Sequence, residues 1–234
     1  INNEEVLEAK HIFAIDYLKL KVEITNNPLE LSQNMVIPLT KFDGEFQPLQ
    51  ESYSKQWVCG SYNDHIQIKA INKNEILIHG NLFKWLNGQN VTGTTDLIQL
   101  VLDTVNRLSQ IFNAITPTDT EIENIKLGLF RIYRIDVNKA LLFDDKQKAQ
   151  QYLSSIKEHG TYPRRDREVE NNGIYFGKGS KRTTLLYYFK GQEIRSHNKQ
   201  QTTLTTELRE YADRMIRCEV RLFNQQLRDQ DLNY

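Results

Sequence analysis

Apolar and polar residues alternate along residues 15–24, and this period of two predicts a half-buried β-strand. One face of that strand carries Leu18, Leu20, Val22 and Ile24. Two further β-rich runs, 65–71 and 75–79, are separated by a polar Asn-Lys-Asn turn and predict a hairpin. Three prolines interrupt residues 26–62, so that segment is expected to be irregular.

A helical period replaces this alternation after residue 95. Thr94 or Thr95 can cap a helix that has Asp96 in its first turn. The residues that share one face of this helix are Leu97, Val101, Val105, Leu108 and Phe112. The spacing therefore predicts an amphipathic helix.

The second half of the chain predicts a βαββαβ unit, the split βαβ arrangement of ferredoxin-like sheets. The expected elements are a strand at 129–137, a helix from Asp144 to Gly160, a hairpin of 173–177 and 183–190, a helix at 204–214 and a strand at 215–223. In this arrangement the helices cover one face of an antiparallel sheet, and the first strand lies between the fourth strand and the third. The expected fold class is therefore α+β.

The first half repeats this pattern loosely, because it also contains a strand, a loop region, a hairpin and a helix. The pattern suggests two pseudo-repeated halves. We expect residues 1–14 to form a lead-in and residues 15–234 to form one domain, with its halves at 15–125 and 126–223.

The composition is that of an ordinary soluble protein, with 39% hydrophobic and 26% charged residues. No apolar run of about 18 residues is present, and no basic-then-apolar leader opens the chain, so we expect a cytoplasmic protein with no membrane association. The two cysteines, Cys59 and Cys218, are too few for a disulfide framework or a cysteine-based zinc site. Basic and acidic residues balance at 30 each, but residues 161–200 hold nine Lys or Arg against four acids.

Strand alternation gathers polar side chains on the face of the predicted sheet that the helices leave open. These residues are Asp136, Glu219, Tyr188, Arg134, Arg217, Arg221 and Lys190. Tyr133 and Tyr187 are expected on the inner face instead.

This set of side chains suits phosphodiester chemistry. Two carboxylates on neighbouring strands can hold one Mg²⁺ or Mn²⁺ ion, and arginines can hold phosphates by bidentate contacts. A tyrosine hydroxyl, deprotonated with the help of the metal or of Lys190, can then attack phosphorus. The competing interpretation is a sheet surface decorated with alternating Arg–Glu ion pairs.

Four segments of the chain resemble, in the same order, the replication initiators of filamentous phages (the gene II protein family). They are Gly88 to Leu97, Arg134-Ile135-Asp136, the hairpin from Tyr175 to Lys190, and Arg217-Cys218-Glu219-Val220-Arg221. Ile15-Asp16-Tyr17-Leu18 is similar to the start of these phage proteins. The hairpin is also similar to that of plasmid rolling-circle initiators, and the family is related to the HUH-type nickases.

The resemblance implies a site- and strand-specific DNA nickase that initiates rolling-circle replication, with 15–234 as its domain and 126–223 as the catalytic half. Tyrosine attack would leave a 5′-phosphotyrosine and a free 3′ hydroxyl, with Mg²⁺ or Mn²⁺ as cofactor. The nucleophile falls on Tyr188, assisted by Lys190, and the acidic site residues fall on Asp136 and Glu219. Origin DNA is the implied substrate, a host helicase and polymerase are the implied partners, and the bacterial cytoplasm is the implied location.

The third metal ligand departs from the family pattern. The phage proteins commonly have His where this chain has Gln89, and the sequence contains no His-x-His. Gln89 or His79 is therefore the candidate for this position. We further expect Lys178, Lys181 and Arg182, together with the three arginines of the sheet, to contact DNA.

Two other functions compete with the nickase. Residues 88–95 almost spell a P-loop, but Thr94 stands where the lysine is required, which argues against a nucleotide hydrolase. A non-catalytic module that binds single-stranded nucleic acid on the open sheet face, through Arg134, Arg217 and Arg221, is the alternative.

Overall fold

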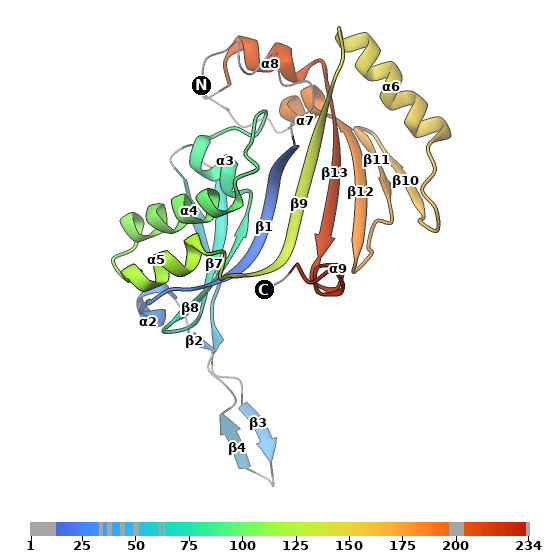
Figure 1. Cartoon of the computed structure of the whole chain (residues 1–234). Helices are drawn as coiled ribbons and strands as arrows, with labels where there is room; N and C mark the ends of the chain where they lie inside the picture. The colour runs from blue at the N-terminus through green and yellow to red at the C-terminus, as the bar shows by residue number, and fades with distance from the viewer. Residues whose placement is uncertain are drawn as a thin grey trace.

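The computed structural model is built on a single large antiparallel sheet (Figure 1). The structure describes residues 13–32, 35–36, 39–42, 45–48, 52–60, 62, 64–196 and 204–232. Among these residues, nine strands form this sheet in the order β10-β11-β12-β13-β9-β1-β8-β7-β6. Their bounds are β1 (Phe13–Glu23), β6 (Gln56–Cys59), β7 (His65–Asn72), β8 (Glu75–Gly80), β9 (Arg131–Leu142), β10 (Arg167–Glu170), β11 (Gly173–Phe176), β12 (Thr183–Phe189) and β13 (Met215–Phe223). The expected α+β class is confirmed.

The strand order of the second half differs from the ferredoxin-like prediction. That prediction placed β9 between β13 and β12, but β13 lies between β12 and β9. The reason is that β9 uses its other edge to pair with β1, from Phe13↔Lys139 to Lys21↔Arg131. In each half the first strand lies beside the last, so the order β9-β13-β12-β11 mirrors β1-β8-β7-β6 across the centre of the sheet.

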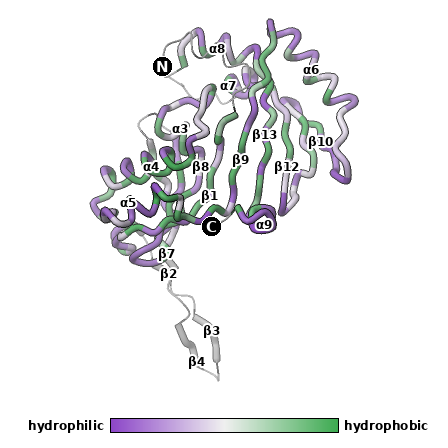
Figure 2. Tube along the Cα trace, viewed as in Figure 1, coloured by the Kyte–Doolittle hydropathy of each residue, from purple (hydrophilic) through white to green (hydrophobic). Residues whose placement is uncertain are grey.

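One face of the sheet carries most of the helices. These are α2 (Pro28–Leu31), α3 (Leu82–Asn87), α4 (Leu97–Ile111), α5 (Asp119–Lys126), α6 (Lys146–His159) and α9 (Asn224–Asp229). The apolar face of β1 packs against α3, α4 and α5 through residues such as Leu18 and Val101, whereas α6 packs on Phe189 and Ile216. Figure 2 shows hydrophobic positions concentrated in the central strands and mostly hydrophilic positions along α6.

The opposite face is covered at one end, which corrects the expectation of helices on one face only. There α7 (Lys190–Ser196) and α8 (Thr206–Ala212) pack with Val91 against Ala140 and Met215, which point to this face. The apolar ends of β9 and β13 require this cover, since exposed apolar side chains are unfavourable in water. Helix α7 was not expected, and it begins at Lys190, where the sequence predicted the end of a strand.

Other boundaries differ from the predictions by small amounts. Asp96 rather than a threonine caps α4, and Asp145 rather than Asp144 caps α6, since each of these side chains accepts from a backbone N–H in the first turn. Residues 26–62, expected to be irregular, contain α2, β6 and the short strands β2 (Met35–Val36), β3 (Leu39–Phe42), β4 (Glu45–Pro48) and β5 (Ser52–Tyr53). The lead-in expected at 1–14 lies almost wholly outside the described residues.

The central pair of strands contains two irregularities of register. Between Ile15 and Tyr17, strand β1 has one residue more than β9, and between Arg134 and Ile132, strand β9 has one residue more than β1. The extra residues are Asp16 and Tyr133. A bulge of this kind interrupts side-chain alternation and re-aims a side chain. Tyr133, expected on the inner face, consequently lines a cavity on the other face.

None of the helices in the described part of the chain is both long and apolar enough to cross a membrane.

Candidate active site

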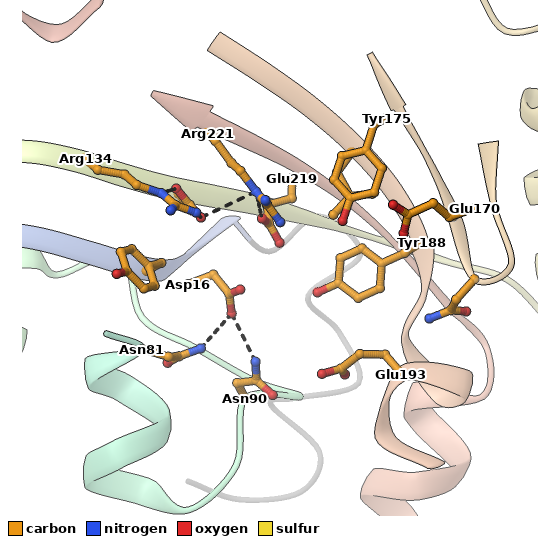
Figure 3. A pocket seen from close by; sticks show the side chains of 15 residues that line it. Asp16, Asn81, Asn90, Arg134, Glu170, Tyr175, Tyr188, Glu193, Glu219 and Arg221 are labelled. Atoms are coloured by element: carbon orange, nitrogen blue, oxygen red, sulfur yellow. Dashed lines mark hydrogen bonds and ion pairs between the residues drawn. The ribbon is translucent and has the colours of Figure 1, made fainter. Parts of the chain in front are cut away.

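A cavity of about 340 Å³ lies on the sheet face opposite α4 and α6, and it gathers side chains from both halves of the chain (Figure 3). Its wall includes three of the residues singled out from the sequence, Tyr188, Asp136 and Glu219. They come from β12, β9 and β13, which are neighbours in the sheet. The convergence of these three side chains on one face of one sheet is therefore observed.

The two adjacent tyrosines of β12 point to opposite faces, as alternation predicts. Tyr188 lines the cavity, and Figure 3 shows its hydroxyl directed toward Asp16 and Glu219. Tyr187 packs beneath α6 instead. Burial raises the pKa of Tyr188 well above its usual value, and nearby carboxylates raise it further. The positive charge of Arg217 lowers this pKa, but by less than burial raises it. The hydroxyl therefore needs help to ionise.

Both predicted acidic residues are buried and paired with arginines. Asp136 accepts from Nε and Nη2 of Arg134, at 2.8 and 2.5 Å, and Glu219 accepts from Nε of Arg221 at 2.8 Å. Burial raises the pKa of Asp136, although the bond from Arg134 opposes the rise. Burial and the neighbouring charge of Asp16 raise the pKa of Glu219 to about 7. The Arg–carboxylate pairs expected on an open surface thus lie inside a cavity.

Asp16 is a further acidic residue of this cavity that strand alternation did not identify. It accepts from the side-chain amides of Asn81 and Asn90, at 3.0 and 3.1 Å, and from Nη1 of Arg217 at 3.4 Å. Alternation assigns Asp16 to the buried face of Leu18, but the bulge in β1 turns it to the other side. The available signal was the similarity of Ile15-Asp16-Tyr17-Leu18 to the phage proteins.

Arg217 lies in the interior, which corrects its expected place on a DNA-binding surface. It is 1% exposed, and its Nη2 donates to the backbone carbonyls of Asn90 and Val91. Its Nη1 lies 3.5 Å from the hydroxyl of Tyr188. A DNA phosphate cannot reach a guanidinium so enclosed, and the guanidinium instead connects Tyr188 and Asp16 with the segment that follows α3.

Lys190 is also enclosed, and it makes different contacts from those expected. Its Nζ donates to Oδ1 of Asn90 at 2.8 Å and to Oε2 of Glu193 at 2.6 Å. Burial lowers the pKa of Lys190 to about 8. The cation that donates to the Tyr188 hydroxyl is therefore Arg217, whereas Lys190 holds Asn90 in place.

The two candidates for a third metal ligand lie elsewhere. Gln89 closes a turn, since its Oε1 accepts from the backbone N–H of Val91 and Thr92, at 2.7 and 3.2 Å. His79 is hydrogen-bonded through Nδ1 to the hydroxyl of Tyr17, at 3.0 Å, and lines a second cavity. Within the described ranges, no three His, Cys, Asp or Glu side chains are arranged as ligands of one metal ion.

The basic residues of the β11–β12 turn have separate surroundings. Lys178 is ion-paired with Glu168 and Glu170, at 2.5 Å each, and Arg182 is ion-paired with Asp229. Lys181 lines the second cavity.

Comparisons with known proteins agree with the resemblance seen in the sequence. Residues 14–234 match the family described as the N-terminal region of the phage replication-associated protein, the gene II protein. A replication-associated protein of this kind from Enterobacteria phage I2-2 is 26% identical over 196 residues, which are 79% of this chain and 56% of that protein, so the chain spans little more than half of its relative's length. A rolling-circle replication initiator protein from Geobacillus stearothermophilus superposes with a TM-score of 0.37 and 14% identity, over 95% of this chain and 78% of that one.

Proposed function

Because the chain belongs to the family of the N-terminal region of the phage replication-associated protein, we propose that it is the DNA-cleaving domain of a rolling-circle replication initiator. It would cut one strand at an origin, with Tyr188 as the nucleophile. The observation that carries this proposal is that the hydroxyl of Tyr188 shares one cavity with Asp16, Asp136 and Glu219. A phosphodiester entering that cavity meets an oxygen nucleophile, acid–base groups and two arginines together.

The proposed step exchanges one phosphate ester for another. The Tyr188 oxygen forms a bond to phosphorus while the bond from phosphorus to the 3′ oxygen breaks. The tyrosine proton passes to Glu219 and then to the departing 3′ oxygen, so the products are a 5′-phosphotyrosine and a 3′ hydroxyl. A carboxyl with a pKa of about 7 can both accept and return a proton near neutral pH. The reverse step rejoins a strand.

Three arginines have different parts in this proposal. Arg217 donates to the hydroxyl of Tyr188 and favours its ionised form, because a buried positive charge stabilises a nearby negative one. Arg134 and Arg221 lie at the cavity wall with about a quarter of their side chains exposed, and are placed to contact the non-bridging phosphate oxygens. Arg217 thus positions the hydroxyl of Tyr188 and does not itself contact the phosphate.

Dependence on Mg²⁺ or Mn²⁺ is part of the proposal. The carboxylates of Asp16 and Asp136 are hard oxygen donors on the wall of one cavity, and the raised pKa of Asp136 reflects negative charge that burial leaves poorly stabilised. We assign the ion to these two groups because Glu219, which carries the proton, would lose its raised pKa if it bound the metal. Asp16 would serve in place of Gln89 and His79, and the side chains would have to move, because the described acidic groups are not arranged as three ligands of one ion. Since Arg134 holds Asp136, metal binding would require it to release carboxylate oxygens. When bound, the ion would offset charge on the phosphate.

We extend the proposal to origin DNA as the substrate and to a host helicase and polymerase as partners. This extension rests on the family resemblance. The non-catalytic alternative is a sheet face that binds single-stranded nucleic acid through Arg134, Arg217 and Arg221. Because Arg217 is enclosed, it cannot make one of these three contacts.

An adduct assay separates cleavage from binding. The protein is incubated with Mn²⁺ and a pool of random-sequence single strands carrying a 3′ label, and protein boiled in detergent is examined for label. A 3′ label should stay with the protein and a 5′ label should not, because tyrosine keeps the downstream fragment. Tyr188→Phe should abolish the adduct, while Tyr187→Phe and Tyr175→Phe, which alter neighbouring tyrosines, should retain it. An adduct that survives in Tyr188→Phe overturns the nucleophile assignment.

A further inference from the structure

A second cavity, of about 560 Å³, lies beside the first on the same face of the sheet. Its wall carries three cations and three aromatic rings, namely Lys19, Arg134, Lys181, Tyr17, Tyr133 and Phe223. None of the described residues that line it is acidic, whereas five acids line the first cavity. Its chemistry therefore suits an anion attached to an aromatic group.

The two cavities share a wall formed by Arg134 and Tyr17. The guanidinium of Arg134 lies over the ring of Tyr17, 4.3 Å from its centroid, and over the ring of Phe223, at 5.3 Å, while it also binds Asp136. A polymer that leaves the first cavity past Arg134 consequently enters the second without leaving the surface of the sheet.

Two features equip the second cavity for a ligand with polar edges. The bulge in β9 turns Tyr133 into it, out of the alternation that would have buried this ring on the other side. His79 donates or accepts through Nδ1 with Tyr17, but its Nε2 is buried and has no hydrogen-bond partner among the described residues. An unsatisfied buried nitrogen is unfavourable. A ligand would reach Nε2 only after the His79 ring turns toward the cavity, and a hydrogen bond there would remove that cost.

We propose that this second cavity binds one nucleotide of the unpaired DNA strand adjacent to the phosphodiester that Tyr188 attacks. The base stacks on Tyr133 or Phe223, and its phosphate is held by Lys19 and Lys181, the combination of stacking and charge that single-strand binders use. An unpaired strand is required because a base within a duplex presents no free face to the rings. This inference rests on the proposed function, because it takes the phosphodiester bound in the first cavity to be the one that is cleaved.

Binding is measured in a Tyr188→Phe background, in which cleavage cannot interfere, with a fluorescent 15-mer of deoxythymidine as the probe. Lys181→Ala should weaken binding about fivefold at low salt and reduce the salt slope by about one. Lys148→Ala removes the same charge from α6, on the opposite face of the sheet, and should change affinity less than about twofold. Tyr133→Leu should weaken binding about fivefold or more, and Tyr133→Phe should restore it.

Photo-cross-linking locates the bound base directly. Oligonucleotides with 5-iodouracil at successive positions are irradiated on the same background, and the cross-linked peptide is identified by mass spectrometry. We expect cross-links within 13–23, 131–142 or 215–223, which are strands that line the cavity. Equal losses in Lys181→Ala and Lys148→Ala would overturn the inference. So would cross-links only outside these strands, or equal competition by a duplex. Failure of the adduct assay alone would reject the nuclease proposal and leave these binding results standing.

Discussion

Nη1 of Arg217 lies 3.5 Å from the hydroxyl oxygen of Tyr188, and both side chains are almost wholly enclosed. Arg217 and Tyr188 are direct partners across β13 and β12, so the backbone register fixes their approach. The guanidinium also binds Asp16 and the backbone after α3. One side chain thereby ties the candidate nucleophile to an acidic group and to a loop from the other half of the chain.

Arg217→Lys tests this relationship. Lysine keeps the charge but loses the forked geometry, so the hydroxyl of Tyr188 should ionise less readily. Adduct formation is expected to slow by about tenfold or more, while the limb near pH 7, which reports Glu219, should keep its position. Adduct rates measured between pH 6 and pH 10 check this. A rate equal to that of the parent would contradict a role for Arg217 in the ionisation of Tyr188.

Arg217→Met should destabilise the fold by about 3 kcal/mol, because it leaves the partly buried carboxylate of Asp16 and two carbonyls without their cation. Urea unfolding measures this value. Arg228→Met, at an exposed position of α9, serves as the control and should cost less than about 0.5 kcal/mol. Similar losses in the two variants would contradict the structural role assigned to Arg217.

The pH dependence of cleavage should report Glu219. If its carboxylate accepts the tyrosine proton, adduct formation should rise as pH rises through about 7, the pKa to which burial and Asp16 raise this group. Glu219→Gln should remove that limb and reduce the rate about a hundredfold or more. A profile that keeps its limb in Glu219→Gln would assign the limb to another group.

Stability should vary with pH through the same carboxyl. Its pKa is higher in the folded protein than in the unfolded chain, where it takes the ordinary value of 4.5, so the folded state holds the proton more tightly. The contribution is fully present below pH 4.5 and is lost as pH rises through about 7. The free energy of unfolding of the parent should therefore fall more steeply across this window than that of Glu219→Gln, as urea unfolding at successive pH values would measure.

Asp16→Asn tests the acidic residue that alternation overlooked. As an oxygen ligand, Asp16 should lower the Mn²⁺ concentration needed for half-maximal adduct formation, so the variant should need about tenfold more. The limb assigned to Glu219 should also move to lower pH, because the charge of Asp16 helps to raise that pKa. Asp103→Asn, on the exposed side of α4, is the control. An unchanged metal requirement would limit Asp16 to tuning Glu219.

Gly93→Ala tests how closely the segment after α3 crosses β1. A Cβ at this position would clash with the Cβ of Ala14, next to the bond from the Ile15 N–H to the Thr94 carbonyl. The free energy of unfolding is expected to fall by about 1–3 kcal/mol, and adduct formation should fall because Asn90 moves. Adding Ala14→Gly removes the clash, so the double variant should be more stable than Gly93→Ala alone. No recovery would show that the two positions are not in contact.

Local periodicity determined the elements and the orientation of most side chains. The alternation of β12 placed Tyr188 and Tyr187 on opposite faces, and the alternation of β13 placed Arg217, Glu219 and Arg221 together; both are observed. These features follow from the period of the strand itself, so neighbouring residues suffice to predict them. Resemblance along the whole chain also indicated the correct family.

Only the tertiary structure decided the strand order, the burial of Arg217 and the arrival of Asp16 in the cavity. Strand order depends on which edges pair over long separations, and the pairing of β9 with β1 has no local signal. Arg217 is enclosed because α7, α8 and a loop more than a hundred residues earlier cover that end of the sheet. Asp16 lies in the cavity because a bulge interrupts the alternation that would have placed it on the helix-covered face.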